Sequence, residues 1–213
     1  MRLYLSSYRI GNHPAALQRL LNGKQRTAFI ANAVDYHQQT ERAERVSRGI
    51  EELRLIDLDP VEIDLRNYFA QPDALRESLN KFDLLWVRGG NSFILRRAFR
   101  KSGADRVIVD LLKNDSLVYG GYSAGIDMLT PTLRGIDLVD DPKLVPSGYD
   151  LAVIWDGLGI LPYSIAPHYK SDHPESAAID QSVTYLIDHH LLFIALRDGE
   201  VIVRDGEVES VLR

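Results

Sequence analysis

The sequence predicts an α/β protein with a three-layer, mostly parallel, doubly wound sheet and a short antiparallel extension near its C-terminal end. Short apolar runs rich in β-branched residues alternate with helical patterns along most of the chain. These runs are apolar on both faces, as strands covered by helices on both sides must be. The last runs are instead separated by Asp-Gly pairs, which are typical of hairpin turns.

The apolar runs and the stripes between them give the expected elements in chain order. The strands predicted for the main sheet are Arg2–Ser6, Thr27–Val34, Val61–Leu65, Leu84–Val87, Leu117–Tyr119 and Ile160–Ala166. The predicted helices include Gln38–Leu55, which has one apolar stripe, a helix that begins at Pro72, and Phe93–Phe99. The expected antiparallel extension comprises Leu192–Leu196, Val201–Arg204 and Val208–Leu212.

Composition limits the possible functions. With 213 residues, of which 45% are hydrophobic, the chain is expected to form a single domain over residues 1–213. It has no apolar run long enough to cross a bilayer and no signal-peptide pattern, so we expect a soluble, cytoplasmic protein without a membrane partner. The absence of cysteine excludes disulfides, thiolate metal sites and a cysteine nucleophile.

The charge pattern does not favour a nucleic-acid partner. The formal net charge is −5, and the most basic stretch is Arg96, Arg97, Arg100 and Lys101 at the spacing of one helix face. We interpret this stretch as a solvated face. No metal or other cofactor is expected, because the histidines and acidic residues near the C-terminal end lack the spacing that brings three ligands together on one element.

The strongest catalytic signal is a strand, tight turn and helix around Ser123. The strand Leu117–Tyr119 leads into Gly121-Tyr122-Ser123-Ala124-Gly125, and an apolar helical pattern follows at once. In a Gly-x-Ser-x-Gly turn the backbone pushes the serine outward, and the glycines leave room where side chains would collide. The sequence therefore predicts Ser123 as a nucleophile.

A second glycine turn, Arg88–Ser92, follows the strand Leu84–Val87. In a parallel sheet both turns lie at the carboxyl edge, where such folds place their sites, so the two turns are expected to face each other. The backbone N–H groups of Gly90 and Ala124 would then form an oxyanion hole. The alternative is a plain connection in which Asn91 or Ser92 caps the next helix.

A serine nucleophile needs a base, and His168 is the candidate because it follows the run Ile160–Ala166 at the same expected edge. His173 is the second choice. The acid that orients the imidazole is sought among three aspartates after the nucleophile helix, Asp137, Asp140 and Asp141, which the sequence alone does not separate.

These motifs together resemble the peptidase E family (peptidase family S51), serine peptidases that include aspartyl dipeptidase and cyanophycinase and have a class I glutamine amidotransferase-like fold. The resemblance covers most of the chain. It is strongest at Arg88–Ser92, Gly121–Gly125, Asp140-Asp141-Pro142 and Leu161–Tyr169. It implies a Ser-His-Asp or Ser-His-Glu triad, with Asp140 the best match for the acid and Asp141 the fallback.

The resemblance also implies a substrate, a small peptide and in particular a dipeptide with N-terminal Asp. Substrate-binding roles are expected for Arg88, Asn91 and Tyr169. Arg88 stands where the family often has glycine, and its guanidinium fits a substrate carboxylate. An esterase or acyltransferase and a noncatalytic binding protein on the same fold are the alternatives, and a monomer or homodimer is expected.

Overall fold

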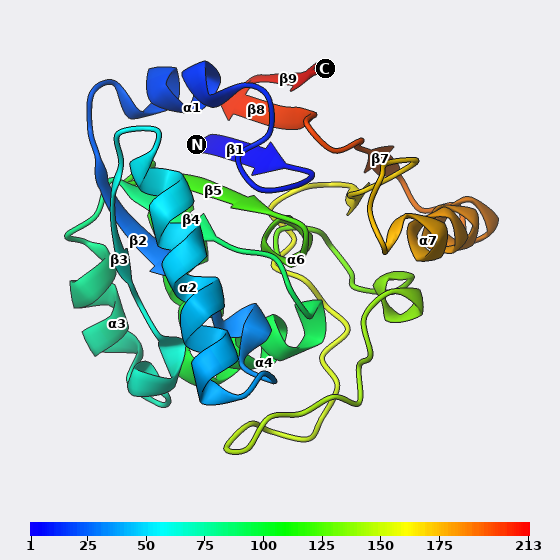
Figure 1. Ribbon diagram of the computed structural model, residues 1–213, viewed down its shortest axis with the longest axis horizontal. Coiled ribbons are helices and arrows are strands. Elements are labelled where there is room, and N and C mark those ends of the chain that lie inside the picture. Colours follow the sequence, from blue (N-terminus) through cyan, green and yellow to red (C-terminus); the bar gives the residue numbers. More distant parts are fainter.

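A seven-stranded sheet forms the centre of the computed structural model, which describes residues 1–213 (Figure 1). The strand order is β3-β2-β4-β5-β1-β8-β9. Its strands are β1 (Arg2–Ser6), β2 (Arg26–Ile30), β3 (Asp59–Glu62), β4 (Leu84–Val87), β5 (Val118–Tyr122), β8 (Val201–Asp205) and β9 (Val208–Leu212). The first five are parallel, and β8 and β9 add an antiparallel hairpin next to β1. The predicted parallel sheet with helices is thus confirmed, and so is an antiparallel hairpin at its edge, formed by β8 and β9.

Helices cover both faces of this sheet because its strands send apolar side chains to both sides. In β1, Leu3 and Leu5 join one core while Tyr4 joins the other. The second core contains α1 (Pro14–Leu21) and α2 (Gln39–Arg54), and the first contains α3 (Pro72–Leu79), α4 (Ser92–Ser102) and α5 (Ala104–Lys113). The helices are too short or too polar to span a membrane.

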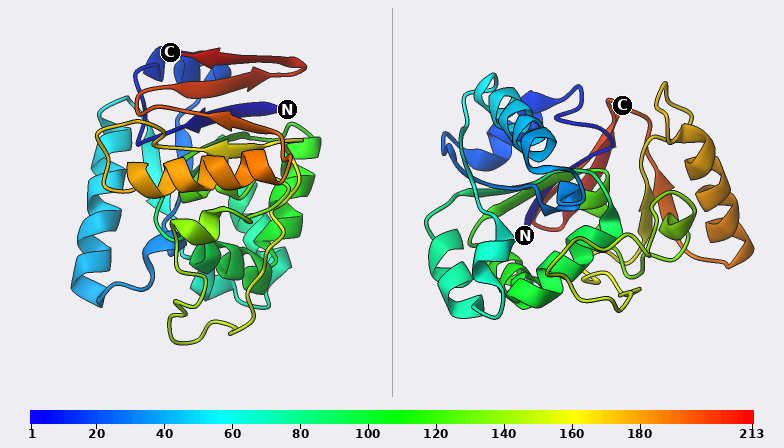
Figure 2. Two further views of the ribbon diagram at one scale, coloured as in Figure 1. Left: turned by 90° about the vertical axis from the view of Figure 1, so that its right-hand side faces the viewer. Right: turned by 60° about the horizontal axis from the view of Figure 1, so that its bottom comes forward.

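Part of the C-terminal prediction is wrong. The strand β7 (Phe193–Ala195) does not join the antiparallel extension but pairs in parallel with β6 (Ser164–Ala166), outside the main sheet. The run Ile160–Ala166, predicted as a strand of the main sheet, therefore lies outside it. The helix α7 (Ser176–Asp188) connects the two strands, so β6-α7-β7 is a parallel crossover unit of its own. It lies beside the main sheet (Figure 2), where Ile179 and Val183 of α7 pack on Ala166.

Several element boundaries differ from the predicted ones. The run 27–34 leaves the sheet after Ile30 and forms a short 3-10 turn, in which the buried Asn32 side chain accepts the backbone N–H of Leu65. The strand β3 begins earlier than predicted and contains Pro60, which an edge strand tolerates. The remaining short elements are η1 (Asn32–Val34), η2 (Leu65–Tyr68), α6 (Ala124–Asp127) and η3 (Ile136–Leu138).

The basic stretch on α4 is only partly a solvated face, because Arg100 is exposed but two of its arginines are not. Arg96 and Arg97 are buried, and their guanidinium groups donate to backbone carbonyls of the long irregular segment between α6 and β6. The acceptors are Asp156, Ala152 and Pro142. A segment with few ladder hydrogen bonds leaves carbonyls unpaired, so two buried arginines satisfy them and hold the segment on the domain.

Candidate active site

Ser123 lies in the turn between β5 and α6 with φ 51° and ψ −125°, a conformation that non-glycine residues rarely adopt. The neighbouring glycines are required by close backbone contact. A Cβ atom on Gly121 would lie 2.6 Å from the Val87 carbonyl oxygen, and one on Gly125 would lie 2.1 Å from it. The Gly-x-Ser-x-Gly turn therefore packs directly against the end of β4, and in this turn the Ser123 side chain points away from the sheet.

The two glycine turns do face each other. A Cβ atom on Gly89 would lie 2.8 Å from the Cβ of Ser123. Gly90 has φ 145°, and its N–H group has no acceptor within the protein. Ala124 is the first residue of α6, where N–H groups lack intrahelical acceptors. Both predicted donors thus belong to turns that meet at Ser123.

His168 is buried, with 1% of its surface exposed, and lies after the end of β6. Its Nδ1 atom is 2.7 Å from Asp198 Oδ1. Because a carboxylate only accepts hydrogen bonds, Nδ1 carries the proton and Nε2 keeps its lone pair. The Ser7 hydroxyl, just beyond β1, accepts the His168 backbone N–H at 2.8 Å and lies 2.9 Å from Asp198 Oδ1, which fixes the pair.

Two aromatic neighbours complete the surroundings of the imidazole. The ring of His173 stacks on that of His168 at 3.7 Å, and Tyr8 packs edge-on at 5.6 Å. Burial lowers the pKa of His168 below its ordinary value, and the nearby His173 lowers it further, while Asp198 opposes both effects. A lowered pKa keeps the imidazole neutral at neutral pH, the form in which it accepts a proton.

The prediction of Asp140 as the partner of His168 is wrong. Asp140 Oδ2 accepts the backbone N–H of Ser92 at 2.7 Å, and burial raises the pKa of its carboxyl to about 6. Asp137 and Asp141 accept the backbone N–H groups of Gly135 and Lys143. None of the three contacts the imidazole.

Asp198 reaches His168 because β6 and β7 are parallel. Ala166 and Ala195 pair in register at the ends of these strands, and His168 and Asp198 follow them within a few residues. Reading Asp198-Gly199 as a hairpin turn hid this carboxylate. Sites in parallel sheets lie at the carboxyl ends of the strands, so the pairing of β6 with β7, had it been recognised, would have pointed to Asp198.

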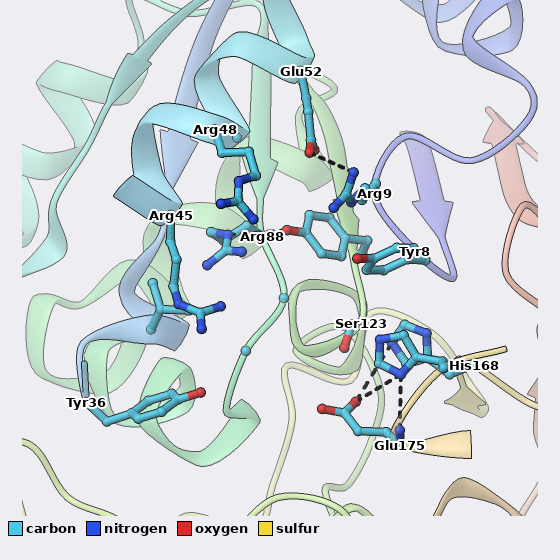
Figure 3. Close-up of a pocket in the computed structure, with 16 residues that line it drawn as sticks. Tyr8, Arg9, Tyr36, Arg45, Arg48, Glu52, Arg88, Ser123, His168 and Glu175 are labelled. Carbon is cyan, nitrogen blue, oxygen red and sulfur yellow. Dashed lines mark hydrogen bonds and ion pairs between the residues drawn. The ribbon is translucent and has the colours of Figure 1, made fainter. Parts of the chain in front are cut away.

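Ser123 and His168 line one cavity, which Figure 3 shows in close-up. The serine hydroxyl is not hydrogen-bonded to the imidazole, a bond that in such sites often tightens only when substrate is bound. The guanidinium groups of Arg45, Arg48 and Arg88 lie on one side in this view, and Ser123, His168 and Glu175 lie on the other (Figure 3).

Arg88 enters the cavity with one nitrogen held in place. Its Nε atom donates to the Tyr122 hydroxyl at 3.2 Å, and its Nη1 atom is buried without a partner. Its Nη2 atom is neither buried nor hydrogen-bonded, and no protein carboxylate pairs with the guanidinium, so this position is suited to a ligand anion.

The other two predicted substrate contacts are not supported. The Asn91 side chain caps α4 by accepting the N–H groups of Phe93 and Ile94 and donates to the Asp141 carbonyl. Tyr169 packs on the small core around α7, away from the cavity lining. For Asn91, the helix-cap alternative raised from the sequence is the observed role.

Glu175 was not foreseen as a site residue. Its Oε2 atom is 3.9 Å from His168 Nε2 and 4.0 Å from His173 Nδ1. Burial raises the pKa of its carboxyl to about 7, and the charges of Asp140 and Asp198 add to this. The three side chains bring possible metal-ligating atoms within 4.8 Å of one another, which the sequence did not predict.

Comparison with known proteins places this geometry in context. The model of peptidase family S51 matches residues 9–211. Peptidase E of Streptomyces coelicolor is 29% identical over 150 residues, which are 68% of this chain and 58% of that protein. Peptidase E of Salmonella arizonae is 35% identical over 99 residues, which are 46% of this chain and 39% of that protein. The chain thus spans about half the length of these relatives.

A solved structure has the same fold over the whole chain. It is that of a candidate peptidase E protein from Listeria monocytogenes EGD-e, with a TM-score of 0.81 and 23% identity. The match covers 100% of this chain and 98% of that one. This likeness supports the arrangement of the sheet and helices.

Proposed function

Since the chain belongs to peptidase family S51, we propose that it is a serine peptidase that hydrolyses small peptides, in particular dipeptides with N-terminal Asp. The observation that carries the proposal is that Ser123, in its strained turn, and His168, held by Asp198, line one cavity with a partly unpaired Arg88. A base, a hydroxyl that faces the substrate and a cation for the substrate carboxylate are the groups that this reaction needs.

In the proposed mechanism His168 Nε2 takes the proton of Ser123 as the hydroxyl oxygen attacks the scissile carbonyl carbon. Asp198 holds the imidazole tautomer and stabilises the imidazolium that forms. The N–H groups of Gly90 and Ala124 bind the oxyanion. His168 then protonates the leaving amine, and a water molecule, deprotonated by the same imidazole, releases the N-terminal aspartate from the acyl-enzyme.

The substrate's charged groups match the cavity. Arg88 binds the side-chain carboxylate of the N-terminal aspartate through Nη2, which has no partner in the protein and, unlike Nη1, is not buried. Glu175 binds the substrate's α-ammonium group, because the only other carboxylate that lines the cavity, Glu52, is paired with Arg9 at 3.2 Å.

A substrate panel tests the proposed function. We expect Asp-Leu to be cleaved faster than Asn-Leu, Leu-Leu and N-acetyl-Asp-Leu, since each of the last three lacks one of the two charges, and N-terminal Asp supplies both. The measurement is kcat/KM for each peptide, with p-nitrophenyl acetate as an ester control and a fluorophosphonate probe for labelling Ser123. A preference for the ester would favour an esterase or acyltransferase. Failure of the probe to label folded protein would favour a noncatalytic binding protein.

The pH profile tests the role of Glu175. Because its raised pKa is about 7, the carboxyl is mostly protonated below that pH and mostly ionised above it, so kcat/KM for Asp-Leu is expected to rise as pH increases through about 7. It falls again as the substrate's α-amino group loses its proton near about pH 8. The lowered pKa of His168 gives a second acid limb at lower pH.

Glu175→Gln is expected to remove the limb near about pH 7 and to leave the lower one, because Gln does not titrate. The matched control is an ester substrate without an amino group, which should show only the lower limb with either protein. An unchanged limb in Glu175→Gln would assign that titration to another group.

A further inference from the structure

The helix α2 contributes two guanidinium groups to the cavity, those of Arg45 and Arg48. The helix lies close to the sheet at this point because residue 49 is glycine. A Cβ atom there would lie 2.5 Å from Cζ of Phe29 in β2. This close approach places Arg48 at the mouth of the cavity, where its side chain is exposed.

The arginines of the cavity differ in whether a carboxylate already neutralises them. Arg9 pairs with Glu52 at 3.2 Å, and Arg45 pairs with Glu41 at 2.8 Å. Arg48 has no ion pair or hydrogen bond, although Glu44 and Glu52 lie one helical turn before and after it.

Together with Arg88, Arg48 therefore leaves two positive charges in the cavity without a protein carboxylate. A dipeptide with N-terminal Asp has two carboxylates, one on the aspartate side chain and one at the C-terminus. Arg88 is the more rigid of the two arginines. The Tyr122 hydroxyl holds its Nε atom, and the next residue in the chain, Gly89, lies against Ser123. The fixed Arg88 suits the aspartate side chain, the group by which the substrate is selected. The C-terminal carboxylate is then left for Arg48 at the cavity mouth.

We propose that Arg48 binds the C-terminal carboxylate of the substrate and so makes the enzyme prefer dipeptides to longer or amidated peptides. The inference rests on the proposed function and deepens it. Lengthening the peptide replaces this carboxylate with an amide, which has no charge for Arg48 to bind. Since Arg48 is exposed, the preference is moderate, about tenfold in kcat/KM, rather than absolute.

The test is a cycle of two protein changes and two substrate changes, run at a pH where Glu175 is ionised. The substrates are Asp-Leu, Asp-Leu amide and Asn-Leu, and the variants are Arg48→Met and Arg88→Met. Arg48→Met should lose about tenfold on Asp-Leu and nothing on the amide, so that the acid and amide rates become equal. Arg88→Met should lose the preference for Asp over Asn but keep the preference for acid over amide.

Arg54→Met is the matched control, because Arg54 is an exposed arginine of the same helix that does not line the cavity. It should keep both preferences. Equal cleavage of acid and amide by the unmodified protein would overturn the Arg48 role while leaving the peptidase proposal intact. An equal loss on both substrates in Arg48→Met would also overturn it, since a general positive potential would then suffice.

Binding measurements separate the two proposals if no peptide is cleaved. Calorimetry with Ser123→Ala protein gives the Kd of Asp-Leu and of its amide without turnover. Absence of cleavage together with about tenfold tighter binding of the acid, lost in Ser123→Ala/Arg48→Met, would reject the peptidase but retain the carboxylate site. Equal binding of acid and amide would reject the site.

Discussion

Replacing Ser123 with alanine is expected to lower kcat for Asp-Leu by about four to six orders of magnitude. The variant loses the attacking oxygen but keeps the oxyanion donors and the arginines. Its melting temperature should hardly change, because alanine keeps the Cβ atom and the same backbone conformation, with φ 51° at this position. The measurements are steady-state kinetics on Asp-Leu and a thermal unfolding curve. Full activity in this variant would end the serine mechanism.

Ser123→Gly is the matched control for backbone strain. Glycine adopts positive φ without steric cost, so this variant should be equally inactive yet more stable by about 1 kcal/mol. An inactive alanine variant and an inactive but stabilised glycine variant together would show that the turn holds the hydroxyl at the expense of stability. A less stable glycine variant would contradict this reading of the turn.

The second large effect is expected at Asp198. Asp198→Asn keeps the size of the side chain but removes the carboxylate that holds the protonated Nδ1 of His168, and with it the correct tautomer. We expect kcat to fall by about three to four orders of magnitude, as in other hydrolases that use such a triad. The acid limb of His168 should also move to lower pH, because the Asp198 charge raises the pKa of that imidazole.

Asp140→Asn is the matched control, since Asp140 was the acid that the family resemblance implied. Its carboxylate accepts the Ser92 N–H, and the amide oxygen of asparagine accepts the same bond. The activity of Asp140→Asn should stay within a few-fold of the original. The triad assignment would be reversed if Asp140→Asn were the inactive variant and Asp198→Asn the active one. Both measurements use kcat/KM as a function of pH.

The sequence alone was sufficient for features that neighbouring residues determine. The strands Arg2–Ser6 and Leu84–Val87 lie where the apolar runs predicted them, and the helix α2 is within a residue of its predicted ends. The turn at Ser123 was recognisable from its five-residue Gly-x-Ser-x-Gly pattern, although the contact that requires these glycines is with the end of β4. Periodicity and turn sterics depend on short stretches of chain, so they can be read from one sequence.

Tertiary structure decided which side chains meet. Asp198 lies 30 residues after His168 and reaches it only because β6 and β7 pair in parallel, a choice that the short apolar runs do not encode. Arg96 and Arg97 had the spacing of a solvated face, yet the long segment beside α4 covers them, and their guanidinium groups donate to its backbone carbonyls. Arg48 enters the cavity because α2 lies close over Phe29. In each case the partner comes from a distant segment, and the pairing of whole elements, rather than any local pattern, sets the contact.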